Sequence, residues 1–164
     1  MKYAKDGRIT EEMEVVAKNE KVDPEFIRKG MAKGRIIIPK SNNRALEEPI
    51  GIGKGLLVKI NANVGSSKKV CNIERELKKA KIAVNYGADT VMDLSTGVTE
   101  KDVKTIRKSI LGEIHVPIGT VPIYQSALRS LEQKGAIIHF DEDDLFNVVE
   151  EQAKEGVDYF TIHV

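Results

Sequence analysis

Short apolar runs alternate with longer amphipathic segments from residue 56 to the last residue of the chain. The apolar runs predict four strands, at Leu56–Asn63, Asp89–Thr96, Val116–Tyr124 and Tyr159–Val164. Between the strands, apolar residues recur every three or four positions and predict helices near 72–85, after Thr99, near 125–134 and over 142–155. This alternation predicts an α/β fold in which a parallel sheet is connected by right-handed crossovers.

The first part of the chain follows a different pattern. Thr10 and Asp23 can each cap a short helix, the second with a proline at its first position. Residues 35–55 contain two prolines and the run GIGKG, which predict a linker or extended arm. We therefore expect two parts: residues 1–55, a helical segment with an extended arm, and residues 56–164, four βα units.

Each predicted strand begins with apolar residues and ends with a group that can form hydrogen bonds: Asn63, Asp93, Tyr124 and His163. In (β/α) barrels, the carboxyl ends of the strands form the ligand-binding face. A doubly wound sheet also binds ligands there, so this feature alone leaves both folds open. Four consecutive strands of one polarity favour the barrel. The expected fold is the N-terminal half of a (β/α)8 TIM-type barrel, preceded by a small helical and extended segment.

Simpler structural roles remain open for several of these positions. Met92 can be ordinary core packing, and a lone histidine beside an apolar run, such as His163, can be structural. Asp93 can accept hydrogen bonds from nearby backbone N–H groups, and Tyr124 can begin a helix instead of ending a strand. The pattern alone predicts a ligand-binding parallel α/β unit and no particular ligand.

The net charge and the cysteine content limit which ligands and binding partners the chain is expected to have. The chain has 164 residues, with 26 basic and 25 acidic side chains and a net charge of +1. This charge gives no reason to expect a nucleic acid or a membrane surface as partner. The single cysteine, Cys71, excludes an internal disulfide, cannot by itself hold zinc or an iron–sulfur cluster, and fits a cytoplasmic location. The run GIGKG lacks the frame of a P-loop.

Five blocks of sequence carry a resemblance to a known family. In order, they are FIRKGMAKGRIIIP (26–39), KINANVGSS (59–67), GADTVMDLSTG (87–97), VPIGTVPIYQ (116–125) and EGVDYFTIH (155–163). Together they resemble the N-terminal part of phosphomethylpyrimidine synthase, the thiamine biosynthesis protein ThiC family. The resemblance runs over nearly the whole chain.

The resemblance implies a radical S-adenosylmethionine (SAM) carbon–carbon lyase of thiamine biosynthesis. Members convert 5-aminoimidazole ribonucleotide to 4-amino-5-hydroxymethyl-2-methylpyrimidine phosphate. The full-length family implies a 4Fe–4S cluster, S-adenosylmethionine, a divalent metal (zinc) and a homodimer. By their positions within the matching blocks, four residues correspond to the ribonucleotide-binding residues of the family: Asn63, Met92, Tyr124 and His163.

The resemblance also implies parts that this chain lacks. The family's serine–arginine–glycine phosphate loop, metal-binding histidines and cluster cysteines have no counterpart, and Cys71 matches none of them. Residues 41–44 read SNNR, where the family usually has asparagine–isoleucine–asparagine–histidine. Because a barrel takes about 250 residues and eight strands, we expect a fragment that carries part of the ribonucleotide site and is inactive alone. Two alternatives are a 5-hydroxybenzimidazole synthase, which uses the same ribonucleotide, and a non-catalytic half-barrel that binds a ribonucleotide or a partner.

Overall fold

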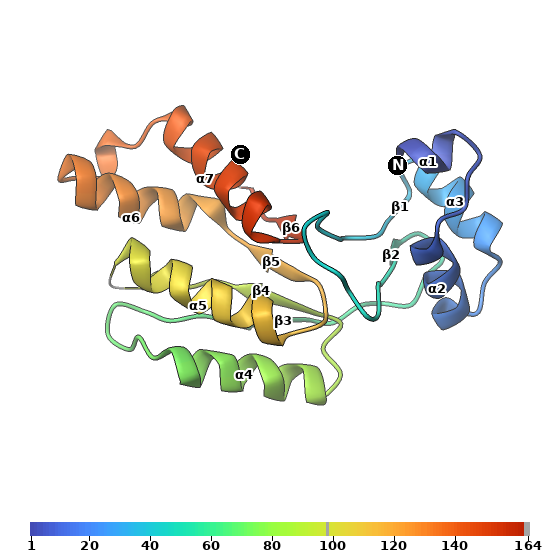
Figure 1. The fold of residues 1–164 in the computed structure, drawn as a ribbon, viewed down its shortest axis with the longest axis horizontal. Coiled ribbons are helices and arrows are strands. Elements are labelled where there is room, and N and C mark those ends of the chain that lie inside the picture. Colours follow the sequence, from blue (N-terminus) through green and yellow to red (C-terminus); the bar gives the residue numbers. More distant parts are fainter. Residues whose placement is uncertain (98, 163–164) are drawn as a thin grey trace.

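The computed structural model describes residues 1–97 and 99–162. Helices α1–α3 gather on one side of the molecule, and a sheet with helices α4–α7 lies on the other (Figure 1). The helices are α1 (Lys2–Lys5), α2 (Glu11–Glu20), α3 (Pro24–Ala32), α4 (Ile73–Asn85), α5 (Glu100–Glu113), α6 (Pro122–Lys134), the short 3-10 helix η1 (Ile137–His139) and α7 (Glu142–Glu155). The strands are β1 (Ile36–Ile37), β2 (Ile52–Gly53), β3 (Asn61–Val64), β4 (Thr90–Asp93), β5 (Ile118–Thr120) and β6 (Tyr159–Phe160).

Strands β3 to β6 form a parallel sheet in which spatial order equals chain order, β3-β4-β5-β6. The predicted α/β fold with a parallel sheet is confirmed. One face of the sheet packs against α4 and α5 through a buried apolar cluster: Val64, Ala80, Val91, Ile106, Ile110, Ile114 and Ile118. Because side chains alternate along a strand, the neighbouring residues Asn63, Met92 and Gly119 lie on the opposite face.

Two of the helices in this part begin at the predicted caps. Thr99 and Asp102 form a reciprocal capping box at the start of α5, and Asp141 and Asp144 form another at the start of α7. Each box satisfies backbone N–H groups that have no partner within the helix. None of the helices in the described part of the chain combines the length and apolar character needed to cross a bilayer.

The N-terminal helices have a separate core and a small sheet that the sequence did not predict. Helices α1–α3 and strand β1 share a buried cluster of Ala4, Met13, Val16, Ala17, Ile27 and Ile36. Within the segment expected to be an arm, β1 pairs antiparallel with β2. Gly53 makes this ribbon possible, because a Cβ there would lie 2.2 Å from the carbonyl oxygen of Arg35, and its φ is +149°. Part of the expected arm is therefore ordered as a β-ribbon.

The first predicted strand is wrong over most of its length. Strand β3 begins only at Asn61, and Leu57, Val58 and Ile60 before it are exposed, with Val58 at 91%. The backbone N–H of Leu57 donates to the Glu20 carboxylate at 2.7 Å, and Lys59 Nζ pairs with the same carboxylate at 2.5 Å. This run is therefore held by Glu20 of helix α2 and not by a neighbouring strand. Helices α1–α3 and the β1–β2 ribbon are together called the N-terminal body.

Residues 41–44 of the arm are held at the amino ends of the sheet strands by Asp158, which precedes β6. This fully buried carboxylate accepts hydrogen bonds from the backbone N–H of Ser41 at 2.8 Å, from Arg44 Nη1 at 2.6 Å and from the N–H of Ile118 at 2.8 Å. Asp89 occupies the equivalent place before β4 and accepts from the N–H of Ile60 at 2.7 Å. The SNNR segment is thus a docked element at the amino ends of the strands, away from their carboxyl ends.

Candidate functional site

Four residues form one row across the open face of the sheet. Asn63 on β3 is in register with Met92 on β4, Met92 with Gly119 on β5, and Gly119 with Tyr159 on β6. Two of the residues predicted to bind a ligand, Asn63 and Met92, are therefore direct neighbours. Asn63 is exposed, whereas Met92 is buried. The row offers a polar end and an apolar centre to a ligand.

Hydrogen bonds orient the polar end of this row. The hydroxyls of Thr90 and Tyr159 both donate to Oδ1 of Asn61, at 2.8 and 3.0 Å. Nδ2 of Asn61 in turn donates to Oδ1 of Asn63 at 2.9 Å. Among the described residues, Nδ2 of Asn63 has no hydrogen-bond partner. The chain of bonds therefore presents Asn63 to solvent as a hydrogen-bond donor.

Gly119 leaves room at the centre of the row. A Cβ at this position would lie 2.4 Å from ring atoms of Tyr159 and 2.9 Å from Cε of Met92. The tyrosine ring and the methionine methyl group therefore meet above the glycine backbone. Burial raises the pKa of Tyr159. The phenol stays protonated and can donate to Asn61.

The other two predicted residues have different outcomes. The prediction that Tyr124 ends a strand is wrong: β5 ends at Thr120, and Tyr124 lies half-buried in the first turn of α6. The physical reason is Pro122, which suits the first position of a helix and cannot donate to a strand ladder. His163 lies outside the described residues. The structure therefore brings together Asn63 and Met92 and puts Tyr124 on the helix that follows β5.

Sequence reasoning missed three contributors to this face: Thr90, Gly119 and Tyr159. Thr90 is two positions from Met92 on the same strand, Gly119 is in register with Met92, and Tyr159 is in register with Gly119. The period of two along a strand could have indicated Thr90 from Met92. Gly119 and Tyr159 become visible only when the strands are placed side by side.

Asp93 has a structural role on the opposite face. Its carboxylate is buried against the helices and accepts a hydrogen bond from the backbone N–H of Ser95 at 2.9 Å. Burial raises the pKa of Asp93, and the bonds from Ser95 and the charge of Arg107 only partly oppose this effect. This geometry supports the expectation that Asp93 accepts hydrogen bonds from backbone N–H groups.

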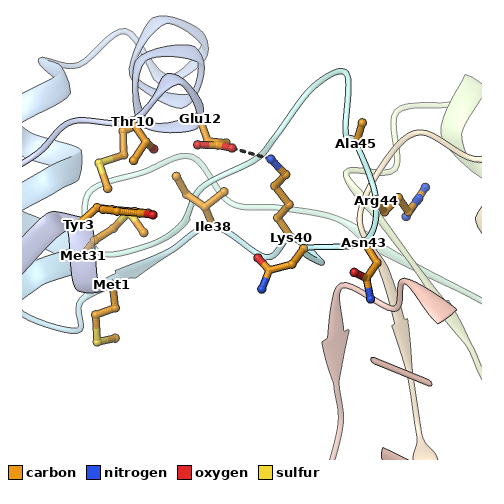
Figure 2. A pocket seen from close by; sticks show the side chains of 12 residues that line it. Met1, Tyr3, Thr10, Glu12, Met31, Ile38, Lys40, Asn43, Arg44 and Ala45 are labelled. Carbon is orange, nitrogen blue, oxygen red and sulfur yellow. Dashed lines mark hydrogen bonds and ion pairs between the residues drawn. The ribbon is translucent and has the colours of Figure 1, made fainter. Parts of the chain in front are cut away.

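A large cavity elsewhere does not contain the predicted residues. About 660 Å³ in volume, it lies between helices α1–α3, with Met1 and Met31 on that side, and the arm, which contributes Lys40, Asn43 and Arg44 (Figure 2). Its cations already have partners, because Lys40 pairs with Glu12 at 2.5 Å and Arg44 with Asp158. The hydrogen bond from Lys40 lowers the pKa of Glu12 to about 2. We therefore place the candidate site on the open face of the sheet.

The described residues do not form a metal centre. Residues 1–97 and 99–162 contain no group of three histidine, cysteine, aspartate or glutamate side chains that could hold a metal ion. The sequence has one cysteine, Cys71, and its side chain is partly buried beside the apolar cluster under the sheet. An iron–sulfur cluster takes three or four thiolates, so the cysteine content does not fit one.

Comparison with known proteins gives a consistent result. The sequence profile described as "Radical SAM ThiC family" matches residues 1–164. The chain is 52% identical over 165 residues to a phosphomethylpyrimidine synthase of Thermus thermophilus and 50% identical over 163 residues to that of Pyrococcus furiosus. It is 50% identical over 163 residues to phosphomethylpyrimidine synthase 2 of Methanothermobacter thermautotrophicus. These alignments cover 99–100% of this chain but only 37–38% of each relative.

Proposed function

Because the chain belongs to the Radical SAM ThiC family, we propose that it supplies part of the ribonucleotide site of a phosphomethylpyrimidine synthase. The observation that carries this proposal is the row of Asn63, Met92 and Gly119 on the open face of the sheet. We also propose that β3–β6 are the first four strands of a (β/α)8 barrel. Their sequential order and the helices α4 and α5 on one face support a barrel over a doubly wound sheet.

The substrate we propose is 5-aminoimidazole ribonucleotide, which the enzyme converts to 4-amino-5-hydroxymethyl-2-methylpyrimidine phosphate. Asn63 donates from Nδ2 to a nitrogen or oxygen acceptor of the ligand. Met92 and the ring of Tyr159, which packs over Gly119, provide an apolar surface for the flat imidazole ring. Such contacts fix the orientation of the substrate and exclude water from one side of it. Tyr124 and His163 are proposed to complete the site from α6 and from the end of β6.

A radical SAM family implies S-adenosylmethionine and a 4Fe–4S cluster, and these supply the radical chemistry. The single cysteine and the absence of a metal-ligand group among the described residues do not fit the cluster or a zinc ion. We therefore assign only substrate binding and orientation to this chain. The complete enzyme is proposed to be a cytoplasmic homodimer and a lyase, and its oligomeric state can be measured by light scattering.

The test is a calorimetric titration of the chain with 5-aminoimidazole ribonucleotide. Asn63→Leu should weaken binding about tenfold, because it removes one hydrogen bond to the ligand and the polar surface around it. Asn147→Leu, on the exposed side of α7, is the matched control and should bind as the parent does. Equal affinity of the parent and Asn63→Leu would remove the sheet face as the binding site.

A further inference from the structure

A second, smaller cavity lies in the N-terminal body, where the end of α3 meets the β1–β2 ribbon. Its volume is about 370 Å³, within the range of small-molecule sites. Two sequence segments line it, the end of α3 with the residues that follow and the GIGKG run. The residues that matter are Phe26, Lys29, Lys33, Arg35, Lys54 and Gly55.

The charged side chains that line this cavity are all positive. Four cationic side chains line it, and none of the residues lining it is acidic. Lys29 lies 3.7 Å from Glu25, whereas Lys33, Arg35 and Lys54 form no ion pair within residues 1–97 and 99–162. The larger cavity in Figure 2 differs, because its Lys40 and Arg44 are neutralised by carboxylates. In a chain of net charge +1, these unpaired cations create a local site for an anion.

An aromatic ring supplies a second element of recognition. Phe26 lines the cavity and is 43% exposed, so its ring is accessible to a ligand. Gly55 approaches the edge of its ring, and a Cβ there would lie 2.9 Å from Cζ of Phe26. The φ of Gly55 is +86°, a backbone conformation that residues with a side chain rarely adopt. Glycine thus keeps the ring accessible beside the cations.

Part of the backbone of the GIGKG run is already paired. Gly53 pairs in the ribbon, and the N–H of Lys54 donates to the carbonyl oxygen of Arg35 at 3.0 Å. These amides cannot cradle a phosphate as those of a P-loop do. Side chains are then the main groups that can hold an anion in this cavity, and an arginine fork and lysine ammonium groups are suited to it.

We propose that this cavity binds a nucleotide, with its base against Phe26 and its phosphates between Lys33, Arg35 and Lys54. Base stacking on an aromatic ring and charge-assisted bonds to phosphate are contacts that this set of residues offers together. The site is separate from the open face of the sheet and does not depend on the function proposed for that face.

The test is calorimetric titration of the 164-residue chain with three probes: ADP, pyrophosphate and adenosine. ADP should bind more tightly than either of the others, and its affinity should fall as salt is added. The double variant Lys33→Ala with Arg35→Ala should raise the Kd for ADP and for pyrophosphate about tenfold or more. Phe26→Ala should weaken the binding of ADP and leave that of pyrophosphate unchanged.

Two controls make the result specific. Lys18→Ala removes one exposed charge from α2 and should change the Kd less than about twofold. Asn63→Leu should leave ADP binding unchanged, which separates this site from the sheet face. No ADP binding at millimolar concentration, an equal effect of Lys18→Ala, or ADP binding no tighter than pyrophosphate would each overturn the proposal. Displacement of ADP by a short single-stranded RNA of much higher affinity would do so as well.

Discussion

Nδ2 of Asn61 lies 2.9 Å from Oδ1 of Asn63, and this contact determines which end of the Asn63 amide faces a ligand. Two hydroxyls, from Thr90 and Tyr159, hold Asn61 in that orientation by donating to its Oδ1. Asn61 thus sets the hydrogen-bonding character that Asn63 presents on the open face of the sheet. In this arrangement Asn61 is a positioning residue.

We expect Asn61→Leu to weaken ribonucleotide binding about tenfold, although Asn63 itself is unchanged. The amide of Asn63 would lose its fixed orientation, and the hydroxyls of Thr90 and Tyr159 would lose their acceptor. Binding is measured by calorimetry. Tyr159→Phe should give a smaller loss, since Thr90 still holds Asn61, and Asn19→Leu on the exposed side of α2 should give none. A tighter complex with Asn61→Leu would contradict the positioning role.

Gly119→Ala should disturb both fold and site. The added methyl group would meet the ring of Tyr159 and Cε of Met92 at distances that real atoms do not adopt. We expect a loss of about 1–3 kcal/mol in the free energy of unfolding, measured by urea denaturation, together with weaker ribonucleotide binding.

Gly112→Ala is the matched control for this substitution. Gly112 lies within α5, and a Cβ there would have open space around it. Alanine is the better helix former, so this variant should gain about 0.5–1 kcal/mol. If Gly119→Ala were as stable as Gly112→Ala, the close packing of the Tyr159 ring and the Met92 methyl group on Gly119 would be refuted.

The sequence was sufficient where local signals decide the structure. Thr99 and Asp141 carry capping groups at the correct spacing, and helices α5 and α7 begin there. It was insufficient where a distant partner decides. The apolar run before Asn61 has the composition of a strand. The carboxylate of Glu20, far earlier in the sequence, instead binds the backbone N–H of Leu57 and the ammonium group of Lys59.

The candidate site shows the same division. Asn63 and Met92 were identified from their sequence blocks, and the register of β3 with β4 makes them neighbours. The place of Tyr159 in the site could not be predicted from the sequence. It depends on the Tyr159 ring extending from β6 over Gly119 of β5 toward Met92. Tyr124 was assigned to a strand because the apolar run continues through Pro122, whereas the backbone turns into a helix there.

Asp158→Asn should release the arm from the sheet. The carboxylate of Asp158 is fully buried and pairs with Arg44, and loss of its charge leaves that guanidinium without its partner. We expect the free energy of unfolding to fall by about 3 kcal/mol. Trypsin should cut after Lys40 or Arg44 faster than in the parent. Asp6→Asn, at an exposed aspartate after α1, should change neither quantity.

Acid should weaken the ion-pair network that joins α5, α6 and α7. Burial alone would raise the pKa of Glu100, but hydrogen bonds from Arg129, Gln125 and Lys104 lower it from 4.5 to about 2. The folded-state pKa is the lower one, so this carboxylate stabilises the protein above its unfolded pKa. That contribution is lost as the pH falls from about 4.5 to about 2.

Glu100→Gln should therefore be less stable than the parent near neutral pH, and the difference should shrink as the pH falls through this window. The measurement is the urea midpoint of both proteins at a series of pH values, with Glu14→Gln, an exposed residue of α2, as the control. Because Arg129 and Lys104 both also pair with Glu151, the variant keeps two ion pairs of the network and should still fold. A stability difference that stayed constant down to about pH 2 would show that Glu100 acts by packing and not through its charge.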